Sequence, residues 1–218
     1  RSIWVTGVQT CALPILLLLL IARLRASGEI PDVPVYLDSP MAIDATELLT
    51  RFGAEHRLTR DDAVSMDNVA ALVRTAEESK ALSRIREPAI ILAASGMATG
   101  GRVVHHLKVF APDARNTILF SGFQAGGTRG AAMAAGATQI RIHGETFAVR
   151  AEVAQLQSAS AHADADELIA WLRQMPARPR QVFVTHGEAS ASDALRHRIK
   201  TELGWSVTVP EYRDEVSL

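Results

Sequence analysis

Cysteine is almost absent from this sequence, and Cys11 is the only one in 218 residues. A single cysteine excludes an internal disulfide framework and a thiolate zinc cluster, and it fits a reducing cytoplasm. A metal site would therefore have to use histidine and carboxylate ligands. The sequence also lacks an excess of positive charge, with 23 basic and 24 acidic side chains. Because no global field would attract a polyanion, any contact with nucleic acid has to be local.

No stretch of the sequence is long and apolar enough to span a bilayer. The apolar run 12–22 contains Pro14 and continues directly into Arg23 and Arg25. A membrane-spanning helix needs about 20 apolar residues, and a secretory signal would need a small-residue cleavage site after the run. We therefore predict a buried helix here, and no membrane partner.

The first 15 residues are set apart from the rest of the sequence. The chain begins with Arg1 in place of a methionine, and residues 1–15 resemble translated sequencing-adapter sequence. We expect residues 1–15 to be a non-native end, in which case Cys11 is not native either. No function is assigned to this segment.

Apolar, β-prone runs alternate with helical patterns along the remaining residues. Hydrophobic residues make up 48% of the sequence, which is enough for a sizeable buried core. Strands are predicted at 33–37, 89–93, 117–120, 139–142, 147–156, 181–185 and 206–209. Helices are predicted at 41–52, near 68–75, from 103 onwards, at 164–175 and at 191–203. This alternation indicates an α/β fold with a largely parallel sheet.

A small-residue loop presents His162 directly before a predicted helix. The surrounding residues, 158–168, read SASAHADADEL. Asp164 and Glu167 have the spacing of an acidic capping box, which explains both carboxylates structurally. His162 has no such explanation, and α/β proteins place binding sites at junctions of this kind. On the local sequence alone, a functional histidine and a solvated surface histidine account for it equally well.

A second histidine, His186, follows an apolar strand in the sequence VFVTHGE. A rigid strand end is a good position for a metal ligand, and imidazole suits Zn²⁺. One helix and one strand separate His186 from His162, so neighbouring parallel strands would bring both loops to one edge of a sheet. The pair is therefore a stronger signal than either histidine alone.

Three other histidines are not assigned to a metal site, and one of them, His143, is interpreted as structural. His143 belongs to a second copy of the His-Gly-Glu tripeptide, but it lies between two alternating apolar runs, and this position predicts a turn between strands. His105 and His106 are adjacent in a predicted helix and face different directions, so a shared metal site is not expected.

Several loops rich in small residues are candidates for holding phosphate. Ser95 and Gly96 follow a predicted strand, with Arg102 nearby. Backbone N–H groups and guanidinium groups are the donors that phosphate prefers. Residues 38–40 and 126–130 have a similar composition. None of these loops matches a Walker A or dinucleotide-binding motif, and a tight turn explains each one taken separately.

Six segments, taken together and in order, resemble the β-CASP branch of the metallo-β-lactamase-fold RNA-processing nucleases. This branch includes bacterial relatives of the cleavage and polyadenylation endonuclease. The segments are YLDSPMAI (36–43), EESKAL (77–82), ILAASGMATGGRVVHHL (91–107), FSGFQAGGTRG (120–130), SASAHADADEL (158–168) and VTHGE (184–188). The resemblance extends over nearly all of residues 16–218.

The resemblance implies an α/β fold in two parts. Residues 16–142 would form part of a β-CASP domain with a parallel sheet. Residues 143–218 would return to a metallo-β-lactamase domain of αββα architecture as its RNA-specificity region. In this family the position of His162 contacts the scissile phosphate and assists proton transfer, and the position of His186 binds one of two zinc ions. Ser160 falls where related enzymes have a phosphate-holding serine, although Ala161 replaces the usual glycine.

The implied activity is hydrolysis of RNA phosphodiester bonds with two Zn²⁺ ions, in the cytoplasm. RNA is the expected substrate, Ser95, Gly96 and Arg102 are candidates for further phosphate contacts, and a homodimer is left open. The family's HxHxDH cluster, its bridging aspartate and its motif A acid are absent from these residues, so we expect this chain alone to be inactive and to bind zinc weakly. The alternatives are a noncatalytic RNA-binding scaffold subunit, which the retained His162 and His186 disfavour, and a DNA-directed β-CASP nuclease.

Overall fold

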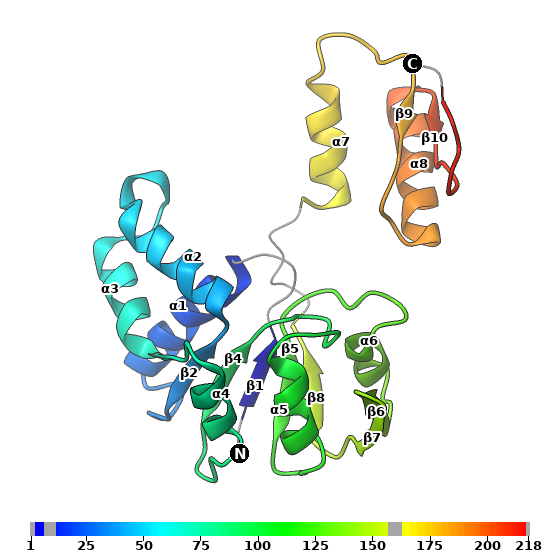
Figure 1. The fold of residues 1–218 in the computed structure, drawn as a ribbon. Helices are drawn as coiled ribbons and strands as arrows, with labels where there is room; N and C mark the ends of the chain where they lie inside the picture. The colour runs from blue at the N-terminus through cyan, green and yellow to red at the C-terminus, as the bar shows by residue number, and fades with distance from the viewer. Residues whose placement is uncertain (1–2, 7–11, 157–162, 217–218) are drawn as a thin grey trace. The chain divides into compact units, whose positions relative to one another are not determined.

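The computed structural model describes residues 3–6, 12–156 and 163–216 (Figure 1). The chain divides into two compact units, residues 1–161 and 162–218. Both units combine helices with parallel strands, which confirms the predicted α/β class. No helix in the described part of the chain combines the length and hydropathy that crossing a bilayer requires.

A six-stranded sheet runs through the first unit, and every neighbouring pair of its strands is parallel. Its order is β3-β2-β4-β1-β5-β8. The strands are β1 (Ile3–Thr6), β2 (Val35–Asp38), β3 (Ala71–Leu72), β4 (Ile90–Ala93), β5 (Thr117–Phe120) and β8 (Glu152–Gln155). Because all six run the same way, the loops after the strands share one edge of the sheet, and the loops before them share the opposite edge.

Helices cover both faces of this sheet (Figure 1). Ile90 and Leu92 of β4 belong to one hydrophobic cluster, and Ile91 and Ala93 belong to the other, as the alternation of side chains along a strand requires. The first cluster also contains residues of α1 (Ala12–Ala26), α2 (Pro40–Arg51) and α3 (Arg60–Val69), and the second contains residues of α4 (Ala76–Leu82), α5 (Val103–Phe110) and α6 (Arg129–Ala134). A short 3-10 turn, η1 (Gly53–Glu55), joins α2 to the segment before α3.

The leucine run forms the buried helix that the sequence predicts. Leu17, Leu18 and Leu19 of α1 are at most 7% exposed and pack against the sheet, whereas Leu16 and Leu20 are 38% and 39% exposed. Pro14 lies in the first turn of the helix, where its missing N–H group costs no intrahelical hydrogen bond.

The helix predicted near 68–75 is wrong, because α3 begins earlier. Thr59 and Asp62 form a capping box: the Thr59 hydroxyl accepts from the Asp62 backbone N–H at 3.1 Å, and the Asp62 carboxylate accepts from the Thr59 N–H at 3.1 Å. The helix therefore starts at Arg60 and ends at Val69. The next residues form β3, which pairs with β2.

The strand predicted at 147–156 is two strands. The first, β7 (Glu145–Ala148), pairs antiparallel with β6 (Gln139–Ile142), and the second, β8, joins β5. Ile142 lies opposite Glu145, so His143 and Gly144 make a two-residue turn with φ values of 50° and 88°. Two-residue hairpin turns of this kind need positive φ at both positions. The structure thus confirms the turn predicted at His143.

Over residues 163–216, which the structure describes, the second unit is a small α/β assembly of two helices and two strands, with β9 parallel to β10. Its elements are α7 (Ala165–Arg173), β9 (Val182–Phe183), α8 (Ala189–Leu203) and β10 (Val207–Thr208), as the sequence predicts within a few residues. The core consists of Ile169, Val184 and Ile199, with partly buried neighbours such as Leu195 and Trp205.

Two boundaries predicted from the sequence stay predictions. Within the segment 1–15, expected to be non-native, β1 pairs with both β4 and β5. Any β-prone run, native or not, would form the backbone hydrogen bonds that β4 and β5 need in this position. The pairing therefore does not test whether the segment is native. The domain boundary predicted between 142 and 143 differs from the division between the compact units at 161 and 162, because β8 completes the sheet of the first unit.

Candidate functional site

Ser95 and Gly96 lie at the edge of the sheet where the parallel strands end. They follow β4, and the loops at 39 and 121 follow β2 and β5 at the same edge. In open parallel sheets, ligands bind beyond the carboxyl ends of the strands. The fold therefore places the predicted Ser95–Gly96 loop at the edge that α/β proteins use for binding.

The loop between β4 and α5 is held in place by close backbone packing. Gly101 has a φ of 72°, and a Cβ atom there would lie 2.8 Å from the Ala94 carbonyl oxygen, so only glycine fits. The Gln124 Nε2 atom donates to the Gly96 carbonyl at 3.0 Å, and the Arg129 Nη1 atom donates to the Ala98 carbonyl at 2.7 Å. These contacts tie the loop to the segment that follows β5.

A buried carboxylate, Asp38, lies at the end of β2 with three side-chain partners. Its Oδ2 atom accepts from the His106 Nε2 atom at 2.6 Å and from the Ser79 hydroxyl at 2.6 Å. Its Oδ1 atom accepts from the Arg102 Nη1 atom at 2.6 Å. Asp38 is 0% exposed and His106 is 2% exposed. We call Asp38, Ser79, Arg102 and His106 the Asp38 cluster.

The Asp38 cluster is arranged to keep the carboxylate charged. Burial by itself raises the pKa of Asp38, but hydrogen bonds from His106, Ser79 and Arg102 outweigh burial and hold the pKa below its usual value. A charged carboxylate only accepts hydrogen bonds, so the His106 Nε2 atom carries a proton. The cluster links β2, α4 and α5 through one charge.

Arg102 points toward this cluster and toward backbone carbonyl groups. Besides Asp38, it donates to the Val73 carbonyl at 2.8 Å and to the Arg74 carbonyl at 2.7 Å. The side chain is 21% exposed. Arg102 therefore fixes the segment between β3 and α4 against β2, and its predicted contact with substrate phosphate stays a prediction.

Sequence reasoning did not find the Asp38 cluster as a unit. It treated residues 38–40 and Arg102 as parts of separate phosphate loops, and it considered His106 only together with His105. One signal was present, since Arg102 and His106 are four residues apart at the start of a helix and so share a face. Their common partner, Asp38, is 64 and 68 residues away in the sequence.

His105 faces His143 of the β6–β7 turn, with ring centroids 5.3 Å apart. Burial, and to a smaller extent His143 and Lys108, lower the pKa of His105. The lowered pKa favours the neutral form of the His105 ring, which packs against the ring of His143.

His186 lies on an exposed loop directly after β9, as the sequence predicts. Its φ of 67° is in the left-handed region that residues other than glycine rarely adopt. Val184 before it donates to the Thr208 carbonyl at 2.9 Å, and a Cβ atom on Gly187 would lie 2.1 Å from the Ser192 hydroxyl. Strand pairing on one side and tight packing on the other thus fix the backbone at His186. Unusual backbone of this kind occurs often at functional positions.

Ser160 and His162 lie outside the described residues, so their predicted roles stay predictions. The helix predicted after them is confirmed. Asp164 is the N-cap of α7, with its Oδ1 atom accepting from the Glu167 N–H at 2.8 Å and with Glu167 accepting from the Asp164 N–H at 2.9 Å. The predicted acidic capping box therefore exists.

The described residues do not by themselves fit a zinc centre. Within 3–6, 12–156 and 163–216, no group of three or more histidine, cysteine, aspartate or glutamate side chains is placed to hold a metal ion. His186 can offer one imidazole, whereas a zinc site takes at least three protein ligands.

Two family models match the chain in consecutive segments. The one described as "Beta-Casp domain" matches residues 15–133, and the one described as "Zn-dependent metallo-hydrolase RNA specificity domain" matches residues 146–210. His186 lies within the second segment, and the Asp38 cluster lies within the first.

Curated relatives include a ribonuclease, an RNase J-like protein and a transcription termination factor. A ribonuclease from Thermus thermophilus is 40% identical over 77% of this chain and 39% of that protein. A transcription termination factor from Pyrococcus abyssi is 33% identical over 86% of this chain and 31% of its own length. An RNase J-like protein from Methanocaldococcus jannaschii is 29% identical over 79% of this chain and 40% of its own length.

The chain thus spans less than half the length of each of these relatives. The first family model alone covers more than half of the 218 residues. This match, supported by the parallel α/β sheet that the structure contains, establishes that the chain belongs to the β-CASP family.

Proposed function

We propose that this chain is part of a zinc-dependent ribonuclease that hydrolyses RNA phosphodiester bonds. The observation that carries the proposal is the position of His186. It is an exposed histidine with constrained backbone at a strand end, within the segment that matches the metallo-hydrolase RNA specificity family. Relatives named as ribonucleases support RNA as the substrate.

Each predicted site residue has a role in this proposal. His186 binds one of two zinc ions, and His162 contacts the scissile phosphate and assists proton transfer. Ser160, together with Ser95, Gly96 and Arg102, contacts substrate phosphate. The two zinc ions require further ligands that the described residues do not bring together. Paired metal ions, once bound, would supply a hydroxide nucleophile and would stabilise the charge that develops on the phosphate.

The test is replacement of His186 in the full-length protein. We expect His186→Ala to lower the rate of RNA cleavage at least about 100-fold, since even substitutions one shell away from a metal cost about 10- to 100-fold. Metal content, measured by mass spectrometry, should fall in the same variant. The matched control is His197→Ala, which removes an exposed histidine from α8. Unchanged turnover in His186→Ala would contradict the proposal.

Two further measurements separate this proposal from its alternatives. The 218-residue chain alone should bind zinc weakly and cleave no RNA, because it offers few ligands. Full-length protein assayed side by side on RNA and DNA of the same sequence should prefer RNA, and a preference for DNA would favour a DNA-directed nuclease. A full-length protein that binds RNA but leaves it intact would favour the scaffold subunit.

A further inference from the structure

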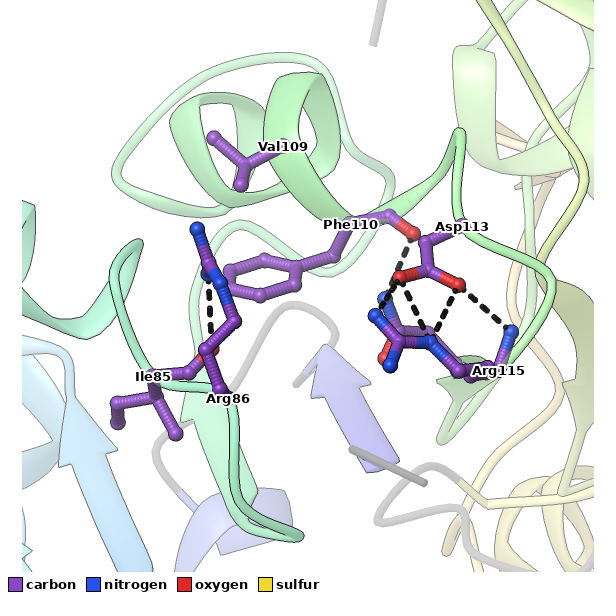
Figure 2. Close-up of a pocket in the computed structure, with 7 residues that line it drawn as sticks. Ile85, Arg86, Val109, Phe110, Asp113 and Arg115 are labelled. Carbon is purple, nitrogen blue, oxygen red and sulfur yellow. Dashed lines mark hydrogen bonds and ion pairs between the residues drawn. The ribbon is translucent and has the colours of Figure 1, made fainter.

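A pocket of about 270 Å³ opens at the amino ends of the strands, on the edge of the sheet opposite to Ser95 and Gly96. Its lining comes from the segments before β4 and β5, and it includes Ile85, Arg86, Phe110, Asp113 and Arg115. Figure 2 shows Arg86 on one side of the Phe110 side chain and the Arg115–Asp113 pair on the other.

Both guanidinium groups retain N–H groups that are free for a ligand. Arg86 uses its Nη1 atom to donate to the Ser83 and Ile85 carbonyls, at 3.4 and 3.0 Å. Arg115 uses its Nε and Nη2 atoms to donate to Asp113, at 2.6 to 3.1 Å. Within the described part of the chain, the Nη2 atom of Arg86 and the Nη1 atom of Arg115 have no hydrogen-bond acceptor.

The carboxyl ends of two helices lie at this edge, and their negative partial charge only partly opposes the positive charge of the two arginines. Helices α4 and α5 finish here, and the free carbonyl groups at helix carboxyl ends repel anions. Two of these carbonyl groups have donors: Arg86 caps Ser83, and the Asn116 Nδ2 atom donates to the Phe110 carbonyl at 3.0 Å. Part of the unfavourable field is thus already neutralised.

The pocket has a net positive charge at neutral pH. Hydrogen bonds from the Arg115 side chain and backbone lower the pKa of Asp113 to about 2, so this carboxylate is ionised. One carboxylate therefore faces two guanidinium groups. Outside the lining, the exposed Arg150 and the carboxylates of Glu87 and Glu152 lie nearby, so the positive charge is confined to the residues that line the pocket.

We propose that this pocket is a second RNA-contact site, in which Arg86 and Arg115, on opposite sides of Phe110, each bind a backbone phosphate of single-stranded RNA away from the catalytic edge. The proposal rests on RNA being the substrate of the whole protein. A guanidinium group presents paired N–H donors that match phosphate oxygens. Val109, which is 42% exposed, and Ile85 also line the pocket. Their apolar side chains can contact the nucleoside attached to a bound phosphate. Because the whole chain has a net charge of -1, such a local site is needed to hold a polyanion.

The test uses the 218-residue chain and a fluorescently labelled single-stranded RNA, with binding followed by anisotropy. Arg86→Ala and Arg115→Ala should each weaken binding by about 3- to 10-fold at low salt. Each should also reduce the slope of log affinity against log salt by about 0.7, as expected for one lost phosphate contact on a single strand. Asp113→Asn should strengthen binding, because it removes the opposing charge and releases the Arg115 donors.

The matched control is Arg84→Ala, which removes a cation from the same loop that does not line the pocket. Thermal unfolding checks the fold of each variant, and Arg86→Lys and Arg115→Lys provide folded versions that keep the charge but lose the paired donors. Equal RNA affinity of Arg86→Ala, Arg115→Ala and Arg84→Ala would overturn the proposal, as would absence of RNA binding by the unsubstituted chain.

Titrations with AMP and with inorganic phosphate separate RNA from small phosphate ligands. If either displaces the RNA at concentrations similar to that of RNA nucleotides, the pocket takes a free phosphate ligand and the RNA assignment is overturned. The two proposals fail in different experiments. Lack of RNA cleavage by the full-length protein contradicts the proposed function, whereas equal affinities of the arginine variants contradict only the second contact site.

Discussion

The two compact units differ in how they fix their functional residues. The first unit has a sheet covered on both faces, and contacts between residues far apart in the sequence hold its loops, as in the Asp38 cluster. In its described part, residues 163–216, the second unit buries only three apolar side chains. The backbone at His186 is fixed by neighbours close in the sequence and by one strand pair. Single substitutions should therefore act over long range in the first unit and locally in the second.

The largest expected effect is that of Asp38→Ala in the first unit. The substitution leaves the partly buried Arg102 and the buried His106 without their shared carboxylate, and breaking a buried charge pair costs about 3–5 kcal/mol. Urea unfolding combined with hydrogen-exchange mass spectrometry should show a lower midpoint for peptides of β2, α4 and α5. Peptides of α7 and α8 should show an unchanged urea midpoint.

The control for this substitution is Asp44→Ala, at an exposed position of α2. It should change the free energy of unfolding by less than about 0.5 kcal/mol. A similarly small change for Asp38→Ala would show that the cluster contributes little to the first unit.

A smaller effect is expected from acid, again in the first unit. Because the pKa of Asp38 is lowered in the folded state, its stabilising contribution is fully present above the ordinary carboxyl pKa of about 3.9 and is lost as the pH falls toward the folded value. Protonation leaves the side chain in place, so the loss is smaller than that caused by its removal. The matched variant is Asp38→Asn, whose own contribution does not titrate. The difference in unfolding free energy between the two proteins should shrink from pH 6 to pH 3, and a constant difference would contradict the assignment.

The smallest expected effect belongs to the second unit. Asp164→Ala removes the N-cap of α7 and should lower the free energy of unfolding of this unit by about 1 kcal/mol. Asp164→Asn should restore most of the loss, since asparagine caps helices about as well as aspartate. Exchange rates of α7 peptides would report both changes. Equal exchange in Asp164→Ala and the unsubstituted chain would show that the cap is dispensable.

Local patterns in the sequence predicted much of the fold. The acidic capping box at Asp164 and Glu167, the turn at His143 and the strand at 117–120 all depend on neighbouring residues, and the structure contains each of them. The start of α3 was missed although it has the same kind of signal, a capping box at Thr59 and Asp62, because the residues that follow it are mostly polar.

The site was predictable only in part, because long-range contacts leave weak traces in a single sequence. The loop position of His186 follows from the strand before it, whereas its left-handed backbone depends on the packing of Gly187 against Ser192. The Asp38 cluster joins residues from three elements. Only the fold brings these residues together, so the sequence alone could not predict which side chains bind the Asp38 carboxylate.

The position of β8 has a practical consequence for dissecting this protein. The second family match starts at 146, yet β8 at 152–155 forms hydrogen bonds with β5 as the last strand of the first sheet. Cutting the chain between 142 and 143 would remove β8, one of the two neighbours of β5, and open an unpaired strand edge, which invites aggregation. Separate expression of the two units is therefore better served by a cut after β8, even though that cut divides a family domain between two polypeptides.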